Sequence, residues 1–174
     1  LRTAYFKKSL GVEAALSELP AGVREQFAER VQFHLLTPAE SHNSQVDGAT
    51  KLVLKTPAGY ALETVIMRTG TGRVSLCISS QVGCAAACGF CATGQMGVAK
   101  SLSAPEMLDQ IVLAGERMHA EGRHVRNIVF MGMGEPFHNE VAVYDVVATL
   151  LSPTLFHHTP GRILISTVGI PDAM

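Results

Sequence analysis

The sequence has 174 residues, 47% of them hydrophobic, and a formal net charge of −1 at pH 7. This length predicts one domain with at most a small appendage, and the apolar content is sufficient to fill a core. No apolar run approaches the ~18 residues that a bilayer-spanning helix needs, and no global excess of basic residues marks a nucleic-acid-binding protein.

Residues 1–45 predict a helical N-terminal accessory region. Apolar residues recur at helical spacing in two stretches, one before Pro20 and one after it. The first stretch contains Val12, Ala15, Leu16 and Leu19, and the second contains Val23, Phe27 and Val31. Because the first residue is a leucine, we expect the chain to begin inside a longer protein.

From Val46 the pattern changes to that of a β meander. The dipeptide Asp47-Gly48 is typical of a turn, and three apolar runs follow, separated by Gly and Pro. These runs read KLVLKT, YALETVIM and RVSLCIS. Glu63 lies in the second run, and by itself it is most simply an outward-facing charge on a strand.

All four cysteines fall within one segment, Cys77 to Gly97, which reads CISSQVGCAAACGFCATGQMG. Cys84, Cys88 and Cys91 have the spacing C-x3-C-x2-C, and thiolates are soft ligands that favour zinc, copper or iron–sulfur clusters. Small residues between them allow the backbone to wrap an inorganic core closely. A four-iron cluster normally takes four cysteines, so three would leave one iron with the open position that is typical of catalytic metal sites.

Other interpretations of the cysteines remain open at this point. Cys77 could be the fourth ligand of a ferredoxin-like cluster. A zinc site usually needs two close Cys/His pairs, and no suitable second pair is obvious. A disulfide framework is disfavoured, because no apolar signal segment starts the chain and clustered cysteines in a cytosolic-type sequence indicate metal or redox chemistry. We therefore expect a cytoplasmic protein.

The remainder of the chain alternates between helix and strand. A capping box, Ser103-Ala-Pro-Glu106, predicts a helix that ends near Gly122. An apolar strand over residues 127–131, a helix over 140–151 and a strand within 162–167 follow. Strand–helix–strand alternation predicts a parallel sheet with right-handed crossovers, and therefore an α/β fold.

Three motifs follow predicted strands, and ligands of parallel α/β folds bind beyond the carboxyl ends of the strands. They are the cysteine-rich segment, Gly132–Pro136 (GMGEP) and Ser166–Gly169 (STVG). The glycines of GMGEP would let the backbone approach a ligand, and the Glu135 carboxylate suits an ammonium group. A plain strand-to-helix turn is the alternative for GMGEP. The histidines are scattered and receive no role; His157 and His158 are expected in a solvated turn.

The cysteine spacing, with Phe90 before the third cysteine, is similar to the signature of radical S-adenosylmethionine (SAM) enzymes. The longer string CISSQVGCAAACGFCATGQMG, with GMGEP and STVGI downstream, resembles the branch that methylates adenine carbon 2 in 23S rRNA and tRNA. This resemblance is tight over residues 63–170 and loose before them. It implies an incomplete TIM-type (radical SAM) partial barrel, preceded by a small helical segment and a β-hairpin, with the hairpin and first half-barrel in residues 46–174.

The resemblance also implies roles for individual residues. The ligands of a [4Fe-4S] cluster would be Cys84, Cys88 and Cys91. The residues that bind SAM would be Phe90, Gly134, Glu135 and Ser166. Glu63 would accept a proton from the adenine ring, and Cys77 would resolve a protein–RNA crosslink by forming a disulfide.

The family's chemistry also uses a methyl-carrying cysteine near the C-terminus, but no cysteine follows Cys91 in this sequence. We therefore expect the chain to be truncated and inactive alone. The segment GVAKSLS departs from the family pattern, which has an aromatic residue and an Arg-Asn pair there. The implied partners are 23S rRNA, tRNA and an electron donor such as flavodoxin, with no membrane, and a monomer is expected.

Two other functions are considered. One is the related branch that methylates carbon 8 of the same adenine and confers antibiotic resistance. The other is a cluster-bearing binding protein without catalysis, which would fail to cleave SAM when reduced.

Overall fold

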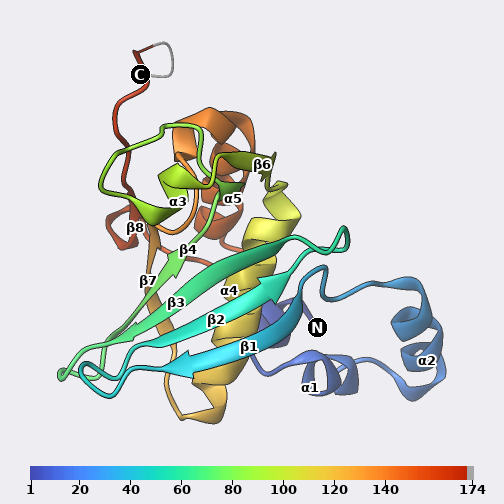
Figure 1. Cartoon of the computed structure of the whole chain (residues 1–174). Coiled ribbons are helices and arrows are strands. Elements are labelled where there is room, and N and C mark those ends of the chain that lie inside the picture. The colour runs from blue at the N-terminus through green and yellow to red at the C-terminus, as the bar shows by residue number, and fades with distance from the viewer. Residues whose placement is uncertain (172–174) are drawn as a thin grey trace.

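The computed structural model describes residues 1–171 and contains a six-stranded mixed sheet with helices on one face (Figure 1). The first four strands form an antiparallel meander: β1 (Thr37–Asn43), β2 (Thr50–Lys55), β3 (Ala61–Arg68) and β4 (Val74–Ile78). Strands β7 (Val125–Phe130) and β8 (Ile163–Ile165) continue the sheet in parallel to β4. The predicted meander and parallel sheet are therefore confirmed.

Two helices complete the βαβ units. Helix α4 (Ala104–Ala120) precedes β7, and α5 (Glu140–Leu151) lies between β7 and β8. At the start of α4 the Glu106 amide donates to Ser103 Oγ, and the Ser103 amide donates to the Glu106 carboxylate, so the predicted capping box is confirmed. Short 3-10 turns, η2 (Pro136–Asn139) and η3 (Pro160–Arg162), precede α5 and β8.

The hydrophobic core lies between the sheet and these helices. Alternate strand residues face α4 and α5 and are fully buried, including Leu62, Ile66, Leu76, Ile128 and Phe130. Each such side chain contributes about 1.5–3 kcal/mol when buried. Because side chains alternate across a strand, the residues between them point to the opposite face. That face carries partly or largely exposed side chains, such as Leu164, which is 54% exposed.

The N-terminal region is helical only as far as Arg30. It contains η1, a short π-helix (Thr3–Lys7), followed by α1 (Val12–Ser17) and α2 (Ala21–Arg30). The expectation of helical structure up to residue 45 is wrong for residues 37–43, which form edge strand β1. This strand reads TPAESHN and is exposed throughout. It has no apolar alternation, and it is held by its backbone pairing with β2.

The buried carboxylate of Asp109 joins the N-terminal region to helix α4. Asp109 Oδ2 accepts hydrogen bonds from the amides of Leu35 and Leu36, both at 2.7 Å, and Asp109 Oδ1 lies 2.8 Å from His34 Nδ1. The other ring nitrogen of His34 lies 3.4 Å from Glu116 Oε1. Hydrogen bonding to Asp109, and then to Glu116, raises the pKa of His34 to about 9, so the ring is cationic at neutral pH.

Among residues 1–171, none of the helices combines the length and apolar character that a bilayer crossing requires.

Candidate functional site

The cysteine loop leaves the sheet after β4 and is closed at its base by a small hairpin. Strand β5 (Gln81–Gly83) pairs with β6 (Val98–Ser101), and the Cys84 amide donates to the Gly97 carbonyl at 2.8 Å. Gly83 has a φ of +78°, and a Cβ there would lie 1.9 Å from the Gly97 oxygen. Only glycine therefore permits this closure.

The three cluster-motif cysteines lie within this closed loop. Cys84 is buried, whereas Cys88 and Cys91 are partly exposed. The Cys91 amide donates to the Cys88 carbonyl at 3.0 Å, and Cys91 caps the short helix α3 (Ala92–Gln95). Gly94 of α3 packs against Cys88, because a Cβ at Gly94 would lie 2.9 Å from the Cys88 nitrogen. Phe90 is 92% exposed at the loop surface.

The side chains of the loop do not converge on a metal position. Within residues 1–171, no group of three or more His, Cys, Asp or Glu side chains is arranged to hold a metal ion. The chemistry of the donors nevertheless fits an iron–sulfur cluster. The loop from Cys84 to Val98 offers three thiols and no carboxylate, which is the soft donor set that such clusters prefer. Cluster ligation by Cys84, Cys88 and Cys91 stays a prediction.

The glycines of GMGEP bring this turn against the segment that follows β4. A Cβ at Gly132 would lie 2.7 Å from the Ile78 carbonyl oxygen, and one at Gly134, with φ +99°, would lie 2.6 Å from Gln81 Cβ. The amides of Ser80 and Gln81 both donate to the Met133 carbonyl, at 2.9 and 3.1 Å. The close approach that these glycines allow is therefore to the protein's own backbone.

Glu135 connects GMGEP to the STVG segment. Its carboxylate is buried, with 3% of the residue exposed. It accepts hydrogen bonds from Thr167 Oγ1 at 2.7 Å, the Val168 amide at 2.9 Å and the Phe137 amide at 2.9 Å. Its own amide donates to Gln81 Oε1 at 3.0 Å. The cysteine segment, GMGEP and STVG therefore meet at one edge of the sheet, as predicted.

Ser166 lies at the same edge. Its amide donates to the Phe130 carbonyl at 3.2 Å, and its side chain is exposed.

Glu63 and Cys77 share the face of the sheet opposite the helices. Cys77 on β4 is paired with Val65 on β3, so Glu63 is its diagonal neighbour, about 7–8 Å away. Glu63 accepts a hydrogen bond from Lys51 Nζ at 2.8 Å, and both side chains are more than 40% exposed. Such an exposed pair is weak. The pairing register therefore places the two residues near each other, although 14 positions separate them in the chain.

Comparison with known proteins identifies the family. No model of a known protein family matches the sequence. A probable RNA methyltransferase of Rhodopirellula baltica is 48% identical over all 174 residues, which are 44% of its length. A probable dual-specificity RNA methyltransferase RlmN of Corynebacterium diphtheriae is 37% identical over 98% of this chain and 46% of its own.

The same result comes from solved structures. The crystal structure of a radical SAM methyltransferase from Sphaerobacter thermophilus superposes with a TM-score of 0.88 and 38% identity. The match covers 97% of this chain and 49% of that one. The chain belongs to the radical SAM RNA methyltransferase family. It spans about half the length of the relatives it matches, and the predicted partial barrel of this family is confirmed.

Residues to which the sequence assigns no role hold this edge of the sheet together in this family member. Gln110 of α4 is fully buried. Its Oε1 accepts from Thr64 Oγ1 at 2.7 Å and from the Ser79 amide at 2.9 Å, while its Nε2 donates to the Ser79 carbonyl at 2.9 Å. The sequence offers one signal for Gln110, because it is a polar residue beside the apolar stripe of α4. Ser79 and Gln81 lie in the string CISSQVGCAAACGFCATGQMG and have no signal of their own.

Ser79 extends this network to the other predicted residues. Its hydroxyl donates to the Glu63 carbonyl at 2.6 Å and accepts from the Met133 amide at 2.9 Å. The segment that opens the cysteine loop is thereby fixed to β3 and to GMGEP.

The position of Cys77 gives the first prediction. Burial raises the pKa of the Cys77 thiol above its usual value, and a hydrogen bond with the Met131 backbone offsets this only in part. Because the thiolate is the nucleophile, Cys77 in a Cys84→Ala/Cys88→Ala/Cys91→Ala chain should react with iodoacetamide more slowly when folded than when unfolded in denaturant. The rate should rise with pH through a midpoint higher than that of the same thiol in the unfolded chain. Equal or faster reaction of the folded chain at neutral pH contradicts this.

Proposed function

We propose that the chain is part of a radical SAM enzyme that methylates carbon 2 of an adenine in 23S rRNA and in tRNA. The observation that carries the proposal is the meeting of the C-x3-C-x2-C loop, GMGEP and STVG at one sheet edge, beside Glu63 and Cys77. Relatives from C. diphtheriae and Sorangium cellulosum are named as dual-specificity RNA methyltransferases, one of them as probable. These names support RNA as the substrate and methyl transfer as the reaction.

Cys84, Cys88 and Cys91 would hold a [4Fe-4S] cluster, and SAM would bind at the iron that lacks a thiolate. Together, when bound, they supply the reductive cleavage of SAM that radical methylation of an unreactive ring carbon requires. The closed base of the loop keeps the three thiols on one short segment at the sheet edge. Cys88 and Cys91 are partly exposed, so SAM could reach this part of the loop from solvent.

The proposed SAM-binding residues are Phe90, Gly134, Glu135 and Ser166. The Glu135 carboxylate already accepts three hydrogen bonds from the chain. A carboxylate offers about four acceptor positions, so one remains for an ammonium group of SAM without loss of the existing bonds. In this arrangement Glu135 would bind cofactor and also hold two loops together.

Glu63 and Cys77 would act on the RNA from the helix-free face of the sheet. The exposed Glu63 carboxylate would accept the ring proton, and its weak contact with Lys51 would be readily exchanged. Cys77 would form a disulfide with the methyl-carrying cysteine, which lies outside this chain. Its thiolate would attack the sulfur of that cysteine, the bond from this sulfur to the carbon attached to the base would break, and that carbon would keep the electron pair and take up a proton. An electron donor such as flavodoxin would supply the reducing electron, and we propose a cytoplasmic, monomeric enzyme.

Anaerobic reconstitution tests the cluster. The wild-type chain should bind about four iron and four sulfide ions, and addition of SAM should change the EPR signal of the reduced cluster. Cys88→Ala should abolish both. Cys77→Ala is the matched control and should retain both. If Cys77→Ala loses the cluster equally, Cys77 is a ligand and the argument for an open iron fails.

The substrate is tested on the full-length Rhodopirellula baltica relative, because the reaction needs residues outside this chain. Nuclease digestion of RNA treated with SAM, followed by mass spectrometry, should give 2-methyladenosine. A product methylated at carbon 8 would contradict the proposed specificity, and no SAM cleavage would favour a binding protein.

A further inference from the structure

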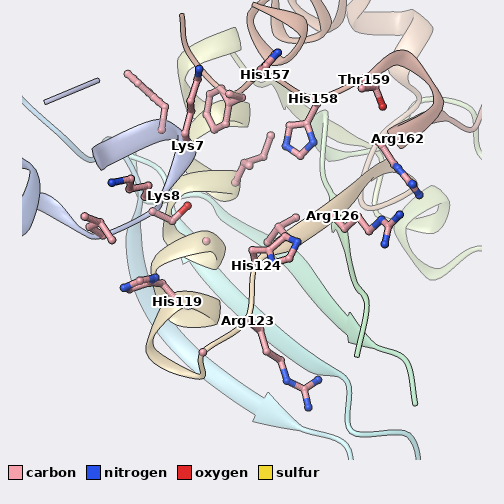
Figure 2. Close-up of a pocket in the computed structure, with 18 residues that line it drawn as sticks. Lys7, Lys8, His119, Arg123, His124, Arg126, His157, His158, Thr159 and Arg162 are labelled. Carbon is pink, nitrogen blue, oxygen red and sulfur yellow. The ribbon is translucent and has the colours of Figure 1, made fainter. Parts of the chain in front are cut away.

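A basic cavity lies at the end of the parallel strands opposite to the cysteine loop. Its volume is about 760 Å³. It is formed by four segments: the end of η1 with the residues after it, the C-terminal end of α4, the start of β7, and residues 156–162 before β8 (Figure 2). The wall therefore combines the N-terminal region with the sheet and α4. No pattern in the sequence indicates that these segments meet.

The charges of the cavity are all of one sign. Five of the chain's 14 Lys and Arg residues line it, and none of the Asp and Glu residues among positions 1–171 does. The five are Lys7, Lys8, Arg123, Arg126 and Arg162. Within the part of the chain that the structure describes, none of the five forms an ion pair. This concentration is notable in a chain whose net charge is −1.

Nearby acids do not cancel this charge. Glu121 lies close to Arg123 in sequence, but its carboxylate accepts two hydrogen bonds from Arg68. Glu18 lies near enough to Lys8 to offset part of its charge. The C-terminus of α4 carries a partial negative charge of about half an elementary charge. This is much less than the five positive charges of the cavity. The cavity therefore holds a surplus of positive charge.

The cavity is also lined by aromatic side chains, among them Phe156 and His158. The ring of His158 stacks on Phe156, with 24° between the planes and 6.4 Å between the centroids. Burial lowers the pKa of His158, so its ring is neutral at neutral pH. Proteins that bind single-stranded nucleic acid combine cations, which contact the backbone, with aromatic side chains, on which the bases stack. The expectation of a solvated turn is confirmed for His157, which is exposed, and is met only in part by His158, which is partly buried.

We propose that this cavity binds the phosphodiester backbone of the RNA, as a second contact away from the reacting base. This inference rests on the proposed function, because RNA is the expected substrate. Strand β7 joins the two ends of the sheet and has six residues, so they lie about 20 Å apart. That distance corresponds to about six base steps of one helical strand. Five cations spread over three stretches of the chain, residues 7–8, 123–126 and 162, suit an extended polyanion better than a single small anion.

The test uses a short fluorescently labelled single-stranded RNA, with binding measured by anisotropy at several salt concentrations. In a Lys8→Gln/Arg123→Gln/Arg126→Gln chain, affinity should fall at least tenfold, and the slope of log affinity against log salt should shrink by about 2. The matched control is Arg30→Gln/Lys55→Gln/Arg73→Gln, which removes three exposed cations outside the cavity. The control should change affinity less than threefold. Equal losses in both triple variants, or none in the first, overturn the proposal.

A competition experiment separates RNA from a free anion. At constant ionic strength, millimolar inorganic phosphate should not displace the RNA from the wild-type chain. Displacement would show a small-anion site and overturn the proposal. Thermal unfolding of each variant checks that the altered side chains, all exposed, leave the fold intact. The RNA-binding measurements need neither cluster nor SAM. A negative RNA-binding result would therefore not affect the conclusion about the cluster, and a failed reconstitution would not affect the conclusion about RNA binding.

Discussion

A Gln110→Leu variant is expected to lose about 4 kcal/mol of unfolding free energy. Leucine has a similar volume but offers no partner to the three groups that Gln110 satisfies, namely the Thr64 hydroxyl and the amide and carbonyl of Ser79. Each buried polar group left without a partner costs about 1–3 kcal/mol. Because the total stability of a domain is about 5–15 kcal/mol, this single change should leave the chain marginally folded.

Urea unfolding followed by circular dichroism measures this effect. Gln26→Leu is the matched control, because Gln26 is exposed on α2, and it should change the free energy by less than about 0.5 kcal/mol. A Gln110→Leu chain as stable as the control would show that the network contributes nothing. Loss of the Gln110 hydrogen bonds should also disturb the candidate site. Ser79 makes the hydrogen bonds with Glu63 and Met133 that position the start of the cysteine loop.

A Glu135→Gln variant is expected to lose both stability and affinity for SAM. The amide nitrogen of glutamine would face a donor, either the Phe137 or the Val168 amide, where the carboxylate now accepts. Hydrogen bonds to a charged acceptor contribute about 1.5–3 kcal/mol each, so the unfolding free energy should fall by about 2 kcal/mol. Loss of the negative charge should weaken SAM binding by at least tenfold, if the ammonium group occupies the fourth acceptor position.

The two losses are measured separately, by thermal unfolding and by calorimetric titration of reconstituted protein with SAM. Thr167→Val is the control, because it removes one donor to Glu135 and keeps the carboxylate. It should cost about 1 kcal/mol and leave SAM affinity nearly unchanged. Reduced stability with unchanged SAM binding in Glu135→Gln would assign Glu135 to the fold alone. Unchanged stability with weaker binding would contradict the importance of its loop contacts.

The elements predicted correctly are those with signals close together in the sequence. Helix α4 begins at the Ser103 capping box, and α5 covers 140–151 as predicted. Strand β7 begins two residues earlier than predicted. The failures have a common cause: β1 (TPAESHN) has no apolar alternation and is held by pairing with β2, and the β5–β6 hairpin spans the whole cysteine loop. Neither leaves a local pattern of apolar residues.

The kind of chemistry can be predicted from the sequence alone, because ligand type and spacing are local. Cys84, Cys88 and Cys91 lie within eight consecutive positions, so the ligand type and the spacing can be read from the sequence. Helix caps and apolar periodicity are local in the same way, since they act over one or two turns.

The tertiary structure decided which distant groups meet. Only the strand register places Glu63 beside Cys77, and only the packing of GMGEP shows that Glu135 accepts hydrogen bonds from STVG. The basic cavity joins residues 6–10 to residues 156–162. The physical reason is that burial and hydrogen bonding depend on what lies nearby in space, and long-range pairing, unlike a helix cap, leaves no signature within a few residues of either partner.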